Sequence, residues 1–541
     1  MRLIGVLGIL ALLGIAWALS YHRRAVRLRI VAWGLGLQFT LALIILGRDA
    51  WSFIGMGALA ALLAVYIVRG GREEGGRSWP ALAGVLAAAA AVAAALAVLG
   101  GARAAGWAAI LCAVAGLANA RFRRAPRLQA PLGVLLVATG LAWLVVSGHH
   151  GQEIFAAFST KVAAFLSLSD YGARFLFGNL ADAQYFFPGG AASWPGFGFQ
   201  FAFKVLPTII FFGGFMAVLY YLGVMQRVIE AIARFMRWTI GTSGAETLSC
   251  SANIFVGQTE APLLIKPFLG DMTRSELLTV MVGGFATIAG GVLAAYIAMG
   301  IPAGHLIAAS VMAAPAALLV GKIIYPELEH SATAGDVEMP DIETGGSVIE
   351  AASGGIQDGF KLAVNVAAML VGFIALIAVI DVTLNWVDSL VDGSLLHGAW
   401  VTYGSGGMSP VVGEYSGIFP GSLQTLFGSI LRPLAWLMGV PWAEAGLVGN
   451  LIGIKLSLNE LVAYGVLSTY SADGAISERS LVIATYALCG FANFSSIGIQ
   501  IGGISAVAPR RRSDLAQLGL KAMFGGAIAS CINATIAGML F

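Results

Sequence analysis

Uninterrupted apolar runs recur along this 541-residue chain, and many reach the length of about 20 residues that a helix needs to cross a bilayer. Only 11% of the residues are charged, whereas a soluble domain carries roughly 25%. The chain therefore lacks the polar surface of a soluble globular protein. Its formal net charge of +3 provides no broad basic face for nucleic acid. These features predict an all-α polytopic membrane protein with the lipid bilayer as its environment.

Basic segments between the apolar runs set the expected orientation, because arginine-rich loops stay on the cytoplasmic side of a membrane. The segments at 22–29, 69–77, 121–127 and 510–512 are basic and are predicted to be cytoplasmic. Both termini are then expected outside. The expected location is the cell membrane, which is the inner membrane if the source is a bacterium.

The expected spans and linkers divide the chain into seven parts. These are two N-terminal spans (1–47), an extra four-span block of open role (48–150), an interfacial helix with a scaffold span and a cytoplasmic interfacial helix (151–240), a first repeat hairpin with its spans (241–325), an acidic cytoplasmic linker (326–358), a scaffold span with an outer interfacial helix (359–438), and a second repeat hairpin with its spans (439–541).

Span positions follow from the apolar runs. In the extra block they are expected at 51–68, 80–99, 105–120 and 131–147, and elsewhere at 3–20, 30–47, 204–222, 275–299, 305–324, 360–386, 481–506 and 515–540, with an outside loop at 171–197.

Two stretches of the chain carry the same landmarks in the same order, which predicts an internal duplication. The first stretch has, in order, Glu246, Glu260, Ser-Glu at 275–276 and Gly-Phe-Ala at 284–286; the second has Glu444, Glu460, Ser-Glu at 477–478 and Gly-Phe-Ala at 490–492. Four such landmarks in register make chance an unlikely explanation.

The segments that hold the two glutamates, 246–267 and 443–464, are too short and too polar to cross a membrane cleanly. Each is interpreted as a re-entrant hairpin, because irregular backbone at membrane depth is tolerated only where it is buried in protein or lines a cavity. With the orientation given above, one hairpin enters from inside and the other from outside. The repeat is therefore predicted to be inverted, which is the common architecture of secondary transporters.

Polar side chains concentrate at the two hairpin tips. Gln258, Thr259 and Glu260 offer an amide, a hydroxyl and a carboxylate side by side, a donor and acceptor set suited to a neutral polar ligand such as a nucleobase. The alternative is a polar turn solvated at the membrane surface. Glu460 would suit a ribose, because a carboxylate accepts hydrogen bonds from two hydroxyls; the alternative there is a structural pair with Lys455.

Broken spans are expected beside both hairpins. Asn493 and Ser496 are three residues apart and share a helical face, and a break near the surrounding glycines would let Phe491 reach the same cavity. The alternative is a helix-packing motif of small residues.

The glycines at 283–291 predict a matching break in the first half. Thr287 and the carbonyls near it would then meet Asn253 and the carbonyls around Val256. Hard cations prefer oxygen ligands, and an all-oxygen site without a dedicated carboxylate suits a monovalent cation such as sodium. The alternative is again glycine-mediated packing.

At these motifs the chain resembles the concentrative nucleoside transporter family. The matching stretches begin at Ala202 (AFKVLPTIIFF), Asn253 (NIFVGQTEAPLLIKPF), Gly453 (GIKLSLNELVAY) and Cys489 (CGFANFSSIG). The resemblance covers roughly 1–47 and 151–541, and the block at 48–150 has no counterpart in it. The Gln-Thr-Glu tip looks like that of sodium-coupled members rather than the Gln-Ser-Glu of proton-coupled ones.

The resemblance implies a homotrimer in which each protomer has a scaffold and a mobile transport domain of two hairpins and two broken helices. It implies the following residue roles: base contacts from Gln258, Thr259, Glu260 and Val292; ribose contacts from Glu460, Phe491, Asn493 and Ser496; and a co-transported sodium ion on the Asn253 side chain, the Val256 carbonyl, Thr287 and the Ile288 carbonyl. Thr287 stands where a serine is common in the family, and both side chains supply a hydroxyl.

We therefore predict a sodium-driven nucleoside importer without enzymatic activity, which moves a transport domain against a trimeric scaffold to alternate access. A proton-coupled nucleoside transporter is one alternative. An intramembrane enzyme with Glu260 and Glu460 as an acid–base pair is an alternative from another class. The inverted repeat favours transport, because duplication gives access from two sides.

Overall fold

A computed structural model describes residues 2–47, 50–69, 79–122, 126–181, 201–335, 345–402 and 410–541. Over these residues the chain is almost wholly helical, and its one small sheet pairs β1 (Trp400–Thr402) with β2 (Gly413–Tyr415) in antiparallel register. Within the same ranges, nine helical stretches are long and apolar enough to cross a membrane. The predicted all-α polytopic class is confirmed.

The helices of the N-terminal half precede the first hairpin. They are α1 (Arg2–Ala18), η1 (Arg23–Ala25), α2 (Leu28–Leu46), α3 (Ala50–Arg69), α4 (Trp79–Phe122), α5 (Pro126–Val146), α6 (Gly151–Leu166), α7 (Ser169–Phe177), η2 (Gly178–Ala181), α9 (Phe201–Tyr221) and α10 (Val224–Ile240).

The remaining helices carry both hairpins. They are α11 (Gly244–Ala252), η3 (Ala261–Ile265), α12 (Arg274–Ala286), α13 (Gly290–Ala298), α14 (Ala303–Ile324), α15 (Val348–Asp388), the π-helical η4 (Ser389–Leu395), α16 (Leu423–Leu437), α17 (Ala445–Ser457), α18 (Glu460–Ala472), α19 (Glu478–Leu488), α20 (Phe494–Val507), η5 (Pro509–Arg511) and α21 (Arg512–Leu540).

The same order of elements occurs twice in this half of the chain. A hairpin (α11 with η3, or α17 with α18) is followed by a broken helix (α12 and α13, or α19 and α20) and then by an unbroken helix (α14 or α21). The breaks fall at 287–289 and 489–493, where the glycine-rich motifs predicted them. The predicted hairpins and broken helices are therefore present.

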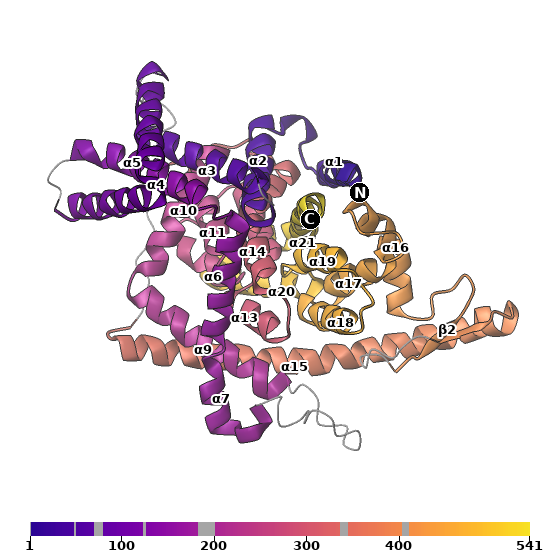
Figure 1. The fold of residues 1–541 in the computed structure, drawn as a ribbon. Coiled ribbons are helices and arrows are strands. Elements are labelled where there is room, and N and C mark those ends of the chain that lie inside the picture. Colours follow the sequence, from indigo (N-terminus) through magenta and orange to yellow (C-terminus); the bar gives the residue numbers. More distant parts are fainter. Residues whose placement is uncertain are drawn as a thin grey trace.

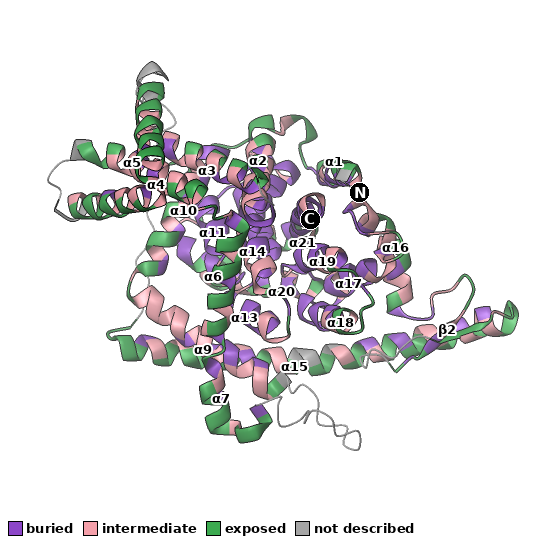
Figure 2. Ribbon diagram, viewed as in Figure 1, coloured by how far each residue is buried: buried purple, intermediate pink, exposed green. Residues whose placement is uncertain are grey.

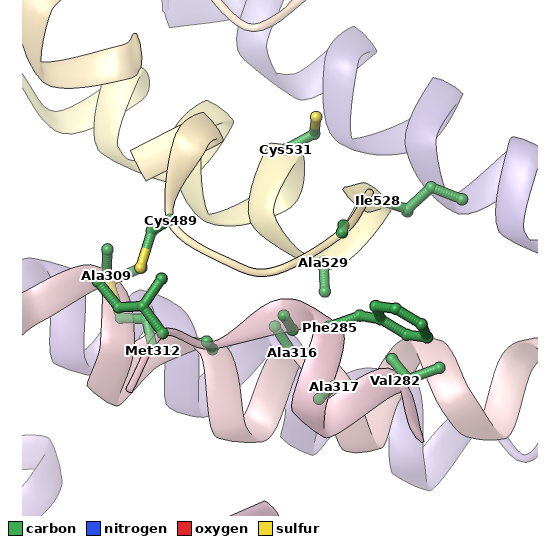
Figure 3. Packing of buried hydrophobic residues seen from close by; sticks show 14 of the residues in the cluster. Val282, Phe285, Ala309, Met312, Ala316, Ala317, Cys489, Ile528, Ala529 and Cys531 are labelled. Carbon is green, nitrogen blue, oxygen red and sulfur yellow. The ribbon is translucent and has the colours of Figure 1, made fainter. Parts of the chain in front are cut away.

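The core lies around α14 and α21, which run through the middle of the molecule and are mostly buried (Figures 1 and 2). α12 packs against both of them. Phe285, one residue from the end of α12, is fully buried beside Ile528 and Ala529 of α21 (Figure 3). A side chain at Gly526 of α21 would overlap Phe285, so α21 meets the end of α12 in direct backbone contact.

Four expected boundaries differ in the structure. α15 begins at Val348, so the acidic linker ends before residue 348 and not at 358. α15 also extends beyond both ends of the span predicted at 360–386. α7 and η2 occupy the start of the predicted outside loop, because Ser169–Phe177 forms a helix with a polar and an apolar face. Residues 182–197 of that loop and 336–344 of the linker lie outside the described residues.

Within the extra block, the spans expected at 80–99 and 105–120 lie on either side of Gly101 in α4, where φ of 63° and ψ of −162° are not helical and divide this element into two helices. α4 packs mainly on α5, which contacts α3, so the block forms an arm at the edge of the molecule away from the hairpins (Figure 1).

A glycine-lined contact joins α9 to the long helix α15, which crosses it in Figure 1. A Cβ added at Gly355 would lie 2.5 Å from the Gly213 carbonyl oxygen and 2.5 Å from the Ala217 Cβ. The neighbouring Gly354 has no heavy atom within 4 Å of an added Cβ. The first glycine is therefore required for close helix approach and the second is not.

We expect Gly355→Ala to destabilise the protein and Gly354→Ala to leave it unchanged or slightly more stable. Overpacking a close contact costs about 1–3 kcal/mol, whereas alanine is favoured over glycine in a helix by about 1 kcal/mol. Thermal unfolding of the purified full chain in detergent measures both changes. Equal melting temperatures for the two variants would contradict the glycine contact between α9 and α15.

Candidate functional site

The first hairpin brings a polar tip into the protein. α11 ends at Ala252 with Asn253 as its C-cap residue, and the chain resumes helical turns only at Ala261. Between them, Gln258 is buried, Thr259 is half-buried and Glu260 is exposed. A Cβ at Gly257 would overlap the Glu260 carboxylate, so the glycine lets this acid fold back against the turn.

A buried ion pair anchors the base of this hairpin. Glu246, in the first turn of α11, accepts a hydrogen bond from the Ser243 backbone N–H at 2.9 Å. Its other carboxylate oxygen lies 2.9 Å from Lys322 Nζ of α14, and the two side chains are 1% and 3% exposed. Lys322 Nζ also lies 3.1 Å from Glu327 and donates to the Ser275 hydroxyl. The hairpin is therefore fixed to the unbroken helix behind it.

The second hairpin turns at Leu458 and Asn459, and Glu460 is the first residue of α18. The Asn459 side chain accepts the Val462 backbone N–H at 2.9 Å and so begins the helix. Tyr296 Oη donates to Glu460 Oε1 at 2.9 Å, and Asn493 Nδ2 donates to Oε2 at 3.2 Å. Each carboxylate oxygen of this buried glutamate therefore has a neutral donor.

The alternative pair between Glu460 and Lys455 does not form. Lys455 is buried in α17, and its Nζ donates to the Ala487 carbonyl at 2.9 Å. The ammonium therefore caps the carbonyl end of α19 next to the break in that helix. Glu460 is left to the tyrosine and the asparagine.

The two helix breaks meet at the centre of the site. The Phe491 backbone N–H donates to the Thr287 carbonyl at 3.2 Å, which joins the break at 489–493 to the break at 287–289. Gly490 has φ of +133°, and a Cβ there would lie 2.6 Å from the Phe285 carbonyl oxygen. Only glycine fits this close crossing, because other residues adopt such a φ at a high cost.

Hydrogen bonds across the repeat bring most of the predicted ligand residues together. Gln258 Nε2 at the first hairpin tip donates to Ser496 Oγ of α20 at 3.2 Å. Asn493, the N-cap residue of α20, accepts the Ser496 backbone N–H at 2.9 Å through Oδ1 and donates to Glu460 through Nδ2. One chain of hydrogen bonds thus connects the first hairpin, the second broken helix and the second hairpin.

The other predicted base and ribose residues are placed less directly. Val292 is buried on α13, Phe491 is half-buried in the second break, and neither forms a side-chain hydrogen bond in this network. Thr259 packs against Gly503 of α20, where an added Cβ would lie 2.8 Å from Thr259 Cγ2.

The predicted cation residues lie where the first hairpin meets the first break. Asn253 is fully buried, and its Oδ1 and Nδ2 have no hydrogen-bond partner among the described residues. Asn253 Nδ2 is 3.3 Å from the Cβ position of Gly283, whose carbonyl accepts the Thr287 hydroxyl at 2.8 Å. The Gly290 N–H donates to the Phe255 carbonyl at 3.1 Å, which ties the turn containing Val256 to the break after Ile288.

Oxygen atoms are the ligands that hard cations prefer. The unpartnered Asn253 amide oxygen, the Thr287 hydroxyl and the backbone carbonyls of the hairpin turn and the first break could therefore hold a hard monovalent cation. The large majority of buried polar side-chain atoms in proteins have a hydrogen-bond partner, whereas both polar atoms of the Asn253 side chain lack one in the part of the chain that the structure describes. Among the described residues, no cluster of three or more His, Cys, Asp or Glu side chains is arranged to hold a metal ion.

Sequence reasoning missed two residues of this network. Tyr296, in α13, is fully buried and donates to Glu460. Gln500, in α20, is fully buried and donates to Gln258 Oε1 at 3.1 Å. Both follow a named site residue by four positions on the same helix, Val292 and Ser496 respectively, and this spacing was the available signal.

Family models of nucleoside transporters match most of the chain. The family model "Na+ dependent nucleoside transporter C-terminus" matches residues 305–538, "Nucleoside recognition" matches 202–303, and "Na+ dependent nucleoside transporter N-terminus" matches 7–66 and 106–180. The last match includes 48–66 and 106–150. The expectation that the whole block at 48–150 has no counterpart in the family is therefore wrong, and within the block this match leaves out 67–105.

Relatives and solved structures agree with these models. An uncharacterized transporter of Haemophilus influenzae is 44% identical over 80% of this chain and 95% of its own length. Mouse sodium/nucleoside cotransporter 1 is 43% identical over 74% of this chain, which spans 58% of that protein. A structure of CNTnw in an inward-facing substrate-bound state is 32% identical with a TM-score of 0.71, covering 100% of this chain and 98% of its own. A CNTnw variant in an outward-facing state is 32% identical with a TM-score of 0.70, covering 100% and 97%.

We expect Lys322→Met to destabilise the protein strongly, because it leaves the Glu246 carboxylate buried without its cation. Removing one partner of a buried ion pair costs about 3–5 kcal/mol. Thermal unfolding in detergent measures the loss. Adding Glu246→Gln to Lys322→Met should restore part of the stability.

Lys361→Met is the matched control, because Lys361 pairs with Asp358 at 3.2 Å but both side chains are more than two thirds exposed. Such exposed pairs contribute about 0–1 kcal/mol. If the Lys322 and Lys361 variants melted alike, the ion pair would have no anchoring role.

Proposed function

The chain belongs to the sodium-dependent nucleoside transporter family, and from this premise we propose that it is a secondary active importer of nucleosides driven by a sodium gradient. Members of this family are transporters and not enzymes, so an acid–base role for Glu260 and Glu460 is set aside. The observation that carries the proposal is the buried chain of hydrogen bonds from Gln258 through Ser496 and Asn493 to Glu460.

This chain of groups suits the two halves of a nucleoside. An ionised carboxylate has about four acceptor positions, and Tyr296 and Asn493 use two of those on Glu460. The others accept the two ribose hydroxyls, with Ser496 and the Phe491 ring completing the sugar site. The base then lies against the first hairpin tip and Val292.

At that tip Gln258, Thr259 and Glu260 provide donors and acceptors for the edge of the base. Val292 is buried nearby on α13 and provides an apolar surface for its face. Because a base is flat and neutral, it needs hydrogen-bonding groups at its edge and no fixed counter-charge. The Gln258 amide and the Thr259 hydroxyl meet this requirement.

Sodium binds, in this proposal, to the Asn253 side chain, the Val256 carbonyl, Thr287 and the Ile288 carbonyl. The unpartnered Asn253 amide supports this assignment. Asn253 and Val256 precede Gln258 on the same hairpin, so an ion that orders the hairpin also orders the base site. The two ligands are then coupled through their preference for one state of the hairpin.

Transport follows when the two hairpins and broken helices move as one unit, together with α14 and α21 on which they pack, against a scaffold that contains α9 and α15. CNTnw structures described as inward-facing and outward-facing support a motion of this kind. We propose the cell membrane as the location, an inverted orientation of the two repeats, and a homotrimer as the assembly. Proton coupling is the alternative to sodium, and the ion dependence of uptake distinguishes the two.

We expect Glu460→Gln to abolish uridine uptake into proteoliposomes while the protein still inserts and folds. The neutral amide keeps the size of the side chain but removes the charge and one acceptor that the ribose hydroxyls need. Glu478→Gln, on the exposed first turn of α19, is the matched control and should transport normally. Unchanged uptake by the Glu460 variant would refute the ribose role.

Replacing external sodium by choline is expected to remove concentrative uptake. Thr287→Val should raise the sodium concentration for half-maximal uptake about tenfold, since it removes one ligand hydroxyl. Thr287→Ser keeps the hydroxyl and should behave as the native protein does. Uptake that persists in choline and depends on external pH would identify proton coupling instead.

A further inference from the structure

Gln500 is a polar side chain in an otherwise largely apolar stretch of α20, and it contacts the first hairpin. It is fully buried. Its Nε2 donates to Gln258 Oε1 at 3.1 Å and to the Met281 carbonyl at 3.1 Å. Because the Met281 carbonyl accepts from Nε2, turning the buried Gln500 amide over would place its oxygen against that carbonyl. The amino group of Gln500 therefore stays directed toward Gln258.

One glycine makes room for this contact, and a second lets α20 pack closely on the neighbouring residue of the hairpin tip. A Cβ at Gly284 of α12 would lie 2.6 Å from Gln500 Nε2 and 2.9 Å from Gln258 Cβ. A Cβ at Gly503 of α20 would lie 2.8 Å from Thr259 Cγ2. Gly284 thus leaves space for the amide pair, and Gly503 holds the hairpin tip close to α20.

The pair determines which end of the Gln258 amide is presented to the site. The donor from Gln500 occupies Gln258 Oε1, so the Gln258 amino group is directed toward Ser496, to which it donates at 3.2 Å. Turning the Gln258 amide over would place two amino groups against each other in a buried position. An unsatisfied buried donor is strongly disfavoured, so one orientation prevails.

We propose that Gln500 is a positioning residue that sets base specificity, by holding the Gln258 amide with its amino group toward the ligand. A base must then offer an acceptor, a carbonyl oxygen or a ring nitrogen, at this point. The inference rests on the proposed function, in which Gln258 contacts the base. Gln500 itself need not touch the ligand.

The test is a double-mutant cycle on nucleoside binding by the full-length protein in detergent, in sodium buffer. The variants are Gln500→Leu, Gln258→Ala and the double variant. Binding is measured by the nucleoside-dependent rise in melting temperature, a signal that only folded protein gives. The ligands are uridine, adenosine and analogues that each lack one acceptor atom on the base.

Gln500→Leu should weaken nucleoside binding about tenfold, which corresponds to one hydrogen bond, and should reduce the preference for ligands that carry the acceptor. In proteoliposomes its KM should rise by a similar factor while the maximal rate stays within about twofold. The double variant should bind like Gln258→Ala alone, because Gln500 acts through Gln258. Gln152→Leu, an exposed site on α6, is the control and should change nothing.

Full additivity in the cycle, or an unchanged preference among the analogues, would overturn the role of Gln500. Gln500→Asn is a second variant, for use if Gln500→Leu does not fold. Its amide is one methylene too short to reach Gln258, so it should show the same weakened binding and reduced ligand preference that are expected of Gln500→Leu. Native-like binding by this variant would also overturn the inference. A native protein that neither binds nor transports any nucleoside would instead refute the proposed function.

Discussion

Polar groups placed at membrane depth must find their partners within the protein, and this constraint shapes the whole centre of the molecule. Glu460 is held by Tyr296 and Asn493, and Gln258 by Gln500 together with Ser496. In each case the partners belong to other helices than the group they satisfy. The site therefore exists only when the two repeated units are packed together.

Breaking two helices is the means by which these groups are brought together. A continuous helix satisfies its own backbone, whereas the breaks at 287–289 and 489–493 leave carbonyl and N–H groups available. One hydrogen bond between such groups joins the two breaks directly: the Phe491 N–H donates to the Thr287 carbonyl. Gly490 and Gly526 allow the backbones to approach, and the fully buried Phe285 closes the core beside them.

Rigid elements surround this centre. α14 and α21 are long and mostly buried, and Lys322 of α14 fixes the first hairpin through Glu246. α15 has 41 residues, roughly 60 Å at the rise of a helix, and crosses α9 through a glycine contact. By contrast, the arm of α4 and α5 lies at the periphery and contributes no residue to the candidate site (Figure 1). Movement of the hairpins together with α14 and α21 against α9 and α15 is compatible with this division.

The helical class, the two hairpins, both breaks and most of the polar residues at the tips could be predicted from the sequence. The length of apolar runs, clusters of glycine and acidic residues within apolar segments are local features, and each can be recognised in a single sequence. The sequence did not predict that Gln258 donates a hydrogen bond to Ser496, 238 positions away. Nor did it predict that the donor to Glu460 is Tyr296, while Lys455 donates elsewhere. Those pairings follow from the tertiary structure, because they depend on how separate helices pack, and side-chain type alone leaves several partners equally suitable.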